Sequence, residues 1–180
     1  MPSSVPRSLA VRAGDPRPGL LHIASMEVLV LYESRRGYTL TVARAIRDDL
    51  RARGHAAAAA ALRSVDAGTL AAADAFVIGT WTAGKIVAGV GPPPEAFDGV
   101  AALPPFEDRP AAVFCTYDVA PKRTLEQLAD ALVGRGARVS VGERFRGGML
   151  RTKRASLAKV PGVVDAALAS FDAADASAAG

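Results

Sequence analysis

The stretch Glu-Val-Leu-Val-Leu-Tyr-Glu-Ser-Arg-Arg-Gly-Tyr-Thr, residues 27–39, carries the strongest structural signal in this chain. Residues 27–32 form a nearly continuous apolar run, which is typical of a parallel strand that is buried on both faces. A polar turn with one glycine follows at residues 34–38, and a helical pattern then spans residues 39–53. A buried strand, a short turn and an amphipathic helix together predict the start of a β-α-β unit.

Six consecutive alanines, residues 56–61, follow this helix. Their intrinsic propensity favours a second helix. We nevertheless predict a strand over residues 55–62, because Gly54 is a natural helix stop and the first crossover needs a second strand beside the first.

Strands and helices continue to alternate along the rest of the chain. Short apolar runs predict further strands at residues 75–80, 110–116 and 137–145. Helical patterns lie at residues 66–73, 95–103, 122–135 and 152–171, the last interrupted at Pro161-Gly162. Residues 81–95 are rich in glycine and proline, and the three prolines at 92–94 argue against a helix there. The alternation predicts an α/β fold with a doubly wound, five-stranded parallel sheet, whose ligands bind beyond the carboxyl ends of the strands.

The length and composition indicate one globular domain, since the chain has 180 residues of which 50% are hydrophobic. We expect this domain over residues 26–172. A disordered N-terminal extension is expected at residues 1–25, and a disordered, alanine-rich tail at residues 173–180. Met26 lies directly before the first strand and is a candidate for the true first residue.

The sequence also argues against several classes of function. The single cysteine excludes an intrachain disulfide and fits a reducing compartment, so we expect a cytoplasmic protein. No apolar run reaches the roughly 20 residues that span a bilayer, and no His or Cys spacing suggests a metal site. The net charge of +4 comes from scattered basic residues without interleaved aromatics, so we expect no nucleic-acid partner.

The loop after the first predicted strand has the features of a phosphate cradle. It leads into a helix N-terminus, where free backbone N–H groups attract anions. Ser34, Thr39 and Thr41 offer hydroxyl donors, and Gly37 lets the backbone approach an anion closely. The alternative is an ordinary strand-to-helix turn with Thr39 as the N-cap.

This loop resembles the phosphate loop of the flavodoxin family, (T/S)-x-T-G-x-T. Ser34, Gly37 and Thr39 match its first, fourth and sixth positions, whereas Arg36 stands at the third position in place of a hydroxyl residue. The resemblance extends over about residues 27–145. It implies a three-layer flavodoxin-like fold with the strand order 2-1-3-4-5, and non-covalently bound FMN.

Two further loops carry the side chains that the resemblance places against the flavin ring. Trp81, the only tryptophan, follows the third predicted strand and can stack on a flat ring or cover the apolar residues 86–90. Tyr117 is positioned to stack, and Asp118 either accepts a hydrogen bond from the flavin or serves as a turn residue. Cys115 is interpreted as a buried strand residue. The predicted FMN-binding residues are Ser34, Arg35, Arg36, Gly37, Tyr38, Thr39, Thr80, Trp81, Thr82, Ala83, Gly84, Thr116, Tyr117 and Asp118.

We therefore expect an FMN-binding, flavodoxin-like protein that acts in electron transfer and has no catalytic residue of its own. A flavin-dependent quinone or porphyrinogen oxidoreductase and a cofactor-free interaction module stay open as alternatives. Arg35, Arg36 and Lys85 make the predicted site basic, and residues 144–154 form a further basic face. Positive charge favours an anionic reduced flavin and an acidic redox partner. The electron donor, the electron acceptor and the oligomeric state stay open.

Overall fold

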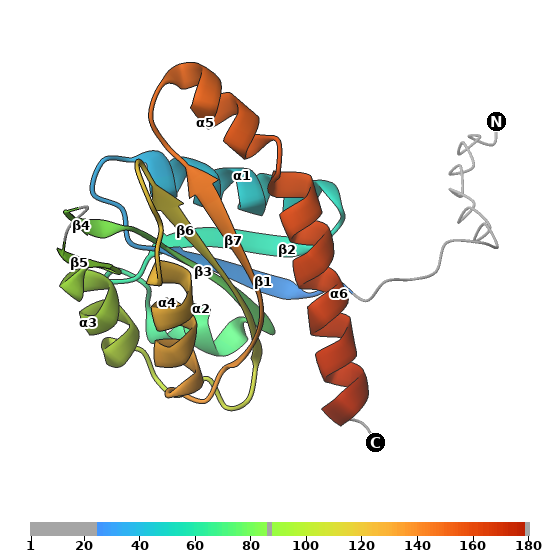
Figure 1. Ribbon diagram of the computed structural model, residues 1–180. Coiled ribbons are helices and arrows are strands. Elements are labelled where there is room, and N and C mark those ends of the chain that lie inside the picture. Colours follow the sequence, from blue (N-terminus) through green and yellow to red (C-terminus); the bar gives the residue numbers. More distant parts are fainter. Residues whose placement is uncertain (1–24, 86–87, 179–180) are drawn as a thin grey trace, which may run out of the picture.

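A five-stranded parallel sheet forms the centre of the protein (Figure 1), in a computed structural model that describes residues 25–85 and 88–178. The strand order is β2-β1-β3-β6-β7, which confirms the predicted 2-1-3-4-5 order. The bounds of these strands are Glu27–Tyr32 for β1, Ala56–Ala61 for β2, Ala75–Trp81 for β3, Pro110–Tyr117 for β6 and Arg138–Arg146 for β7. The predicted extension at residues 1–25 lies outside the described residues except for Ser25.

The alanine strand β2 confirms that tertiary context overrides local propensity. Its six alanines pair in parallel with β1, from Glu27 opposite Ala56 to Tyr32 opposite Ala61. Alternate residues of this edge strand therefore form backbone hydrogen bonds with β1, and the pairing joins the alanines to the main sheet, which outweighs their preference for a helix.

Helices cover both faces of the sheet and enclose two cores. One face is covered by α1 (Tyr38–Ala52) and α6 (Val160–Ala178), and the other by α2 (Ala67–Ala72), α3 (Pro94–Ala102) and α4 (Thr124–Val133). The apolar stripes of these helices pack on strand residues that are almost completely buried, as the continuous apolar runs predict. Among the described residues, no helix combines the length and hydropathy of a transmembrane span.

Gly79 lies at the centre of the sheet, directly under an aromatic ring. It pairs with Phe114 across β3 and β6, and a Cβ atom at Gly79 would stand only 2.0 Å from the Cζ atom of Phe114. The Phe114 ring meets the Phe145 ring edge-to-face, with their centroids 5.9 Å apart. The absence of a side chain at Gly79 is therefore what lets these buried rings close over the sheet.

The helix predicted at residues 95–103 is confirmed as α3, which begins and ends one residue earlier, so only the exclusion of Pro94 from a helix was wrong. The rest of the segment at residues 81–95 contains structure for which the sequence analysis made no prediction. The segment contains a small antiparallel pair of strands, β4 (Ala83–Lys85) and β5 (Ala88–Gly91), separate from the main sheet. Helix α3 begins at Pro94, because the first helical position needs no backbone N–H and suits the fixed φ of proline.

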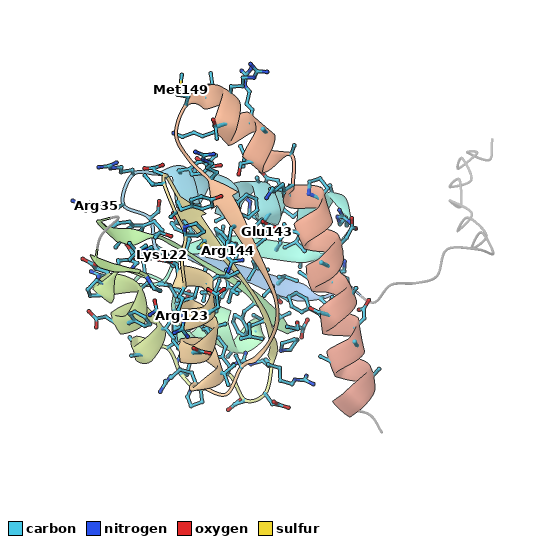
Figure 2. The ribbon with its side chains drawn as sticks, viewed as in Figure 1. Arg35, Lys122, Arg123, Glu143, Arg144 and Met149 are labelled. Atoms are coloured by element: carbon cyan, nitrogen blue, oxygen red, sulfur yellow. The ribbon has the colours of Figure 1, made fainter. Side chains whose placement is uncertain are left out.

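The C-terminal helical region differs from the prediction as well. It forms two helices, α5 (Leu150–Leu157) and α6, and the break falls at Ala158-Lys159 instead of Pro161-Gly162. Pro161 is accommodated in the first turn of α6. Helix α6 continues to Ala178, so the tail predicted as disordered from residue 173 is helical over most of its length. Helix α5 projects beyond the sheet (Figure 1), with Met149 at its outer end (Figure 2).

Candidate functional site

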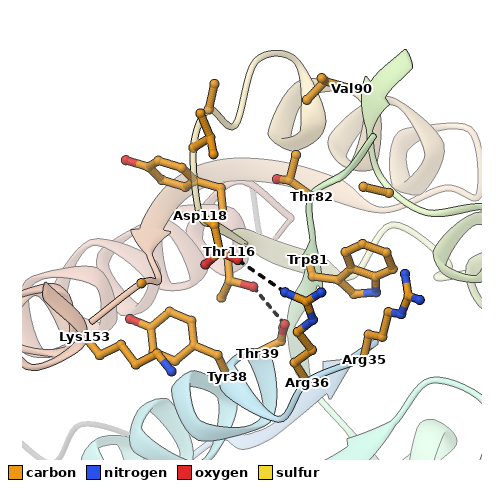
Figure 3. Close-up of a pocket in the computed structure, with 15 residues that line it drawn as sticks. Arg35, Arg36, Tyr38, Thr39, Trp81, Thr82, Val90, Thr116, Asp118 and Lys153 are labelled. Carbon is orange, nitrogen blue, oxygen red and sulfur yellow. Dashed lines mark hydrogen bonds and ion pairs between the residues drawn. The ribbon is translucent and has the colours of Figure 1, made fainter. Parts of the chain in front are cut away.

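A cleft of about 660 Å³ opens at the carboxyl ends of β1, β3 and β6 (Figure 3). This volume lies within the range of small-molecule sites, and the position is the one expected for an open parallel sheet. The cleft is lined by ten of the predicted site residues, namely Arg35, Arg36, Tyr38, Thr39, Trp81, Thr82, Ala83, Thr116, Tyr117 and Asp118.

Of the other four predicted residues, Ser34, Gly37 and Thr80 do not line the cleft, and Gly84 is placed only by its strand. The Ser34 hydroxyl accepts a hydrogen bond from the backbone N–H of Leu40, 3.3 Å away. Gly37 is the N-cap of α1, with a φ of 82° that favours glycine, so the alternative of Thr39 as the N-cap is wrong. Thr80 is fully buried within β3, and Gly84 lies in β4.

The start of α1 faces the cleft with free backbone donors. No described residue accepts a hydrogen bond from the N–H groups of Gly37, Tyr38 or Thr39, and the N-cap Gly37 has no side chain to cap them. Such unsatisfied donors, together with the helix dipole, attract an anion. Arg35 and Arg36 in the preceding turn add positive charge at the same end of the cleft.

Arg35 and Arg36 are held by contacts that a ligand can replace. The Arg35 guanidinium lies over the Trp81 ring, 5.5 Å from its centroid. An Arg36 nitrogen lies 3.9 Å from an Asp118 oxygen across the cleft (Figure 3), but both side chains are largely exposed, at 82% and 63%. An exposed ion pair of this length contributes little stability, so Arg36 is available for another anion.

A buried hydroxyl pair joins α1 to β6 at the floor of the cleft. Thr39 Oγ1 and Thr116 Oγ1 are 2.8 Å apart, and their side chains are 2% and 4% exposed. Each hydroxyl is the other's hydrogen-bond partner, which fixes the first turn of the helix against the end of the strand.

Replacing only one of these threonines is expected to cost more than replacing both. In Thr39→Val or Thr116→Val, the remaining hydroxyl stays buried without its partner, which destabilises the fold by about 1–3 kcal/mol. The double variant removes both polar groups, so its loss is expected to be smaller than the sum of the single losses. Urea unfolding of all four proteins measures this coupling. Additive losses would contradict it.

The far side of the cleft contains Tyr38, which was predicted for the site, and Lys153, which was not. The Tyr38 hydroxyl donates to the backbone oxygen of Arg146, 3.1 Å away, and the Lys153 ammonium lies 5.3 Å from the Tyr38 ring centroid. Burial raises the pKa of Tyr38, so its hydroxyl stays a donor. The additional lining residues are Val90, Val119, Ala120, Gly148 and Lys153. Of these five residues, only Gly148 and Lys153 lie in a segment that the sequence had singled out for its charge, the basic face at residues 144–154.

Thr82 lines the cleft near the ends of the strands. Its Oγ1 atom is buried, and its polar neighbour is the Cys115 thiol of β6. Because solvent does not reach this oxygen, the hydroxyl belongs to the wall of the cleft, and the free donors of the cleft are the amides at the start of α1.

Cys115 lies within β6 and is inaccessible, as interpreted from the sequence. It is 0% exposed, and burial raises the pKa of its thiol from 9.0 to about 12, against the opposing effects of Arg144 and Thr82. The thiolate is the reactive form, so this cysteine is poorly suited to redox or nucleophilic chemistry.

Thiol labelling is therefore expected to report unfolding. Iodoacetamide at pH 8 should leave folded Cys115 unmodified and should modify it rapidly in urea. Because the unfolded thiol ionises near its ordinary pKa and the folded thiol does not, this group should also lower the unfolding free energy as pH rises from 9.0 towards about 12. Labelling of the folded protein at the rate of a free thiol would contradict the buried assignment.

Comparison with known proteins identifies the family. The model of the flavodoxin family matches residues 30–159, which is well over half of the chain. The chain belongs to the flavodoxin family. None of the curated proteins compared with it matches. Flavodoxins bind FMN, so FMN is the cofactor expected for the cleft.

Solved flavodoxin structures share the fold. Flavodoxin 2 from Bacillus cereus is 25% identical with a TM-score of 0.62, and the alignment covers 79% of this chain and 97% of that protein. A flavodoxin from Pseudomonas aeruginosa is 22% identical with a TM-score of 0.59, covering 79% of this chain and 99% of that one. Rubredoxin oxygen:oxidoreductase from Desulfovibrio gigas has a TM-score of 0.67 at 15% identity, but the alignment covers 83% of this chain and only 37% of that larger protein. This chain thus matches whole flavodoxins and about a third of the larger enzyme.

The residues of the cleft fit FMN. Its phosphate is an anion, which suits the free N–H groups at the start of α1 and the neighbouring arginines. Its ring system is flat, which suits the aromatic side chains of Trp81 and Tyr117 that line the cleft. Arg36 occupies the position at which the phosphate-loop pattern of the family has a hydroxyl residue. The site therefore lacks one hydroxyl but gains a positive charge, which attracts the phosphate.

Proposed function

We propose that this chain binds one FMN non-covalently in the cleft and uses it to carry electrons between redox proteins. The observation that carries this proposal is that unsatisfied donors at the start of α1 and aromatic side chains at the ends of β3 and β6 face one cleft. The family membership supports the same cofactor.

At one end of the cleft, the chain would hold the phosphate. The backbone N–H groups of Gly37, Tyr38 and Thr39 would donate to it, with Arg36 exchanging Asp118 for the phosphate oxygens. The Thr39–Thr116 hydrogen bond would keep this turn in place. Preorganised donors of this kind need little rearrangement on binding.

At the other end, Trp81 and Tyr117 would flank the ring. FMN supplies the electron chemistry when bound, and the protein orients it and sets its electrostatic surroundings. Among the described residues that line the cleft, Arg35, Arg36 and Lys153 are cationic and Asp118 is the one carboxylate. We propose on this basis that the redox partner has an acidic surface. The single cysteine fits a reducing compartment, and it supports a proposed location in the cytoplasm.

Titration of the apoprotein with FMN tests the proposal. We expect one FMN per chain, with quenching of both flavin and Trp81 fluorescence, and weaker binding of riboflavin because it lacks the phosphate. No binding at micromolar FMN would overturn the proposal. Steady-state reduction of a quinone by NAD(P)H without an added reductase would show an enzyme instead of a carrier.

A further inference from the structure

The segment from β7 to the start of α6 is strongly cationic. Residues 144–159 contain six basic side chains and no acidic one. Arg144 pairs with Glu126, and Lys159 pairs with Glu143. The other four cations form no ion pair with a described residue, and these are Arg146, Arg151, Lys153 and Arg154. Uncompensated charge concentrated on one short helix creates a local positive field at the surface.

Exposed apolar side chains lie beside these cations. Met149 is 80% exposed and Leu150 68%, and Val119 in the loop after β6 is 64% exposed. Five large hydrophobic side chains are exposed among the described residues, so three of the five gather here. Exposed apolar side chains within a polar rim mark interaction sites.

The two loops that carry these side chains are tied together at the mouth of the cleft. The Gly147 N–H donates to the Tyr117 backbone oxygen over 2.6 Å, so the turn before α5 lies against the loop that contains Val119. The Ser156 hydroxyl accepts from the Arg146 N–H over 2.8 Å, which anchors α5 to the end of β7. Val119 and Gly148 both line the cleft. The surface is therefore held in a fixed position next to the proposed FMN site.

We infer that this surface, which consists of Val119, Met149, Leu150, Arg151, Lys153 and Arg154, docks a redox protein that presents carboxylates around an apolar centre. The inference rests on the proposed function, because the surface adjoins the cleft and a partner seated on it would lie close to the bound cofactor. Charge complementarity accelerates such an encounter, and the apolar centre slows dissociation.

The same features fit a protein better than an anionic membrane. A helix that lies on a membrane buries an apolar stripe along its length. In α5, the exposed residues after Leu150 are Arg151, Arg154 and Ala155, so the apolar part ends at the first turn and continues instead onto the neighbouring loop through Val119. The apolar area is compact and surrounded by charge, as at the centre of a protein interface.

Electron transfer at varied salt tests the inference with defined probes. The FMN-loaded protein is photoreduced and mixed rapidly with an acidic rubredoxin or with basic mitochondrial cytochrome c. We expect the rate constant for rubredoxin to fall by about tenfold between low and physiological salt, and that for cytochrome c to rise. Arg151→Gln/Arg154→Gln should slow the rubredoxin reaction about fivefold at low salt, and Met149→Ser/Leu150→Ser should slow it at all salt concentrations.

Two single variants provide a matched comparison. Arg154→Gln removes a charge from the proposed surface, and Arg63→Gln is its control. Both remove one exposed positive charge, but Arg63 follows β2 at the opposite edge of the sheet from α5. We expect Arg154→Gln to slow the rubredoxin reaction about twofold and Arg63→Gln to leave it unchanged. Equal effects of the two variants would overturn the inference.

A second measurement separates this inference from the FMN proposal. Zinc-substituted rubredoxin, which transfers no electrons, is titrated into the ¹⁵N-labelled apoprotein, and chemical-shift changes should gather at residues 117–119 and 147–155. If the protein does not bind FMN but these chemical-shift changes are observed, the proposed function is wrong and the docking surface is still supported. No shifts in this region, or binding to phosphatidylglycerol vesicles in place of rubredoxin, would overturn the docking surface.

Discussion

Replacement of Gly79 by alanine is expected to lower the free energy of unfolding by about 3 kcal/mol. The added methyl group would stand 2.0 Å from Phe114 Cζ and 2.2 Å from Cε1, far inside van der Waals contact. Phe114 is 0% exposed and its ring packs edge-to-face on Phe145, so the ring can move only by disturbing the core beneath α1 and α6. Strain must therefore spread into the backbone of β3 or β6.

Urea unfolding followed by circular dichroism measures this loss, and Gly162→Ala is the matched control. Gly162 is exposed in the first turn of α6, and a Cβ atom there meets nothing within 4 Å. The same substitution should therefore be neutral or stabilise the protein by up to about 0.5–1 kcal/mol, because alanine is the better helix former. A loss below about 1 kcal/mol for Gly79→Ala would show that the two rings repack easily.

Replacement of Trp81 by alanine is expected to weaken FMN binding by about 10- to 100-fold. An aromatic ring stacked on a flat heterocycle contributes about 1–3 kcal/mol to binding, and alanine removes that contact. Trp81 ends β3 at the lining of the cleft, where Arg35 lies over its ring in the free protein. Fluorescence titration of the apoprotein with FMN measures the change.

Two comparisons make this result specific to stacking. Trp81→Phe should retain most of the affinity, and Trp81→Ala should weaken riboflavin by the same factor as FMN, because stacking does not involve the phosphate. Arg36→Gln should weaken FMN more than riboflavin, since its charge acts on the phosphate. Unchanged FMN affinity in Trp81→Ala would contradict the assignment of Trp81 to the ring.

The main sheet could be predicted because each of its strands is either a buried apolar run or is required by the crossover rule. The alanines of β2 are the clearest case, since their composition favours a helix and only the need for a partner beside β1 indicates a strand. The pair β4 and β5 carried no comparable signal. It is short, rich in glycine and alanine, and lies outside the main sheet, and Val90 is the one β-branched residue within its two strands, so β-propensity does not mark it.

Helix boundaries at prolines were mispredicted for one physical reason. Proline breaks a helix interior but suits its first turn, and a sequence alone does not say which of the two a given proline occupies. Pro94 and Pro161 both occupy first turns. The break before α6 falls at Ala158-Lys159, and neither alanine nor lysine is a residue type that predicts the end of a helix.

The position of the candidate site could be predicted, but its far wall could not. The carboxyl ends of parallel strands and the helix that follows β1 converge by topology, which is why Trp81 at the end of β3, Thr116 near the end of β6 and Thr39 in the first turn of α1 line one cleft. Lys153 reaches the cleft only because α5 turns back over Tyr38, through contacts between residues more than a hundred positions apart. Such contacts depend on the folded geometry and leave no local pattern.

The division of the protein into two cores has a consequence for its synthesis. The core beneath α2, α3 and α4 uses residues up to about Val139, whereas the core beneath α1 is filled only when Val164 and Phe171 of α6 arrive. While the chain is still on the ribosome, Val28 and Val30 of the first strand and the apolar side of α1 therefore remain uncovered long after they have emerged. Throughout this interval the nascent protein presents an apolar surface that chaperones can bind and that other chains can join.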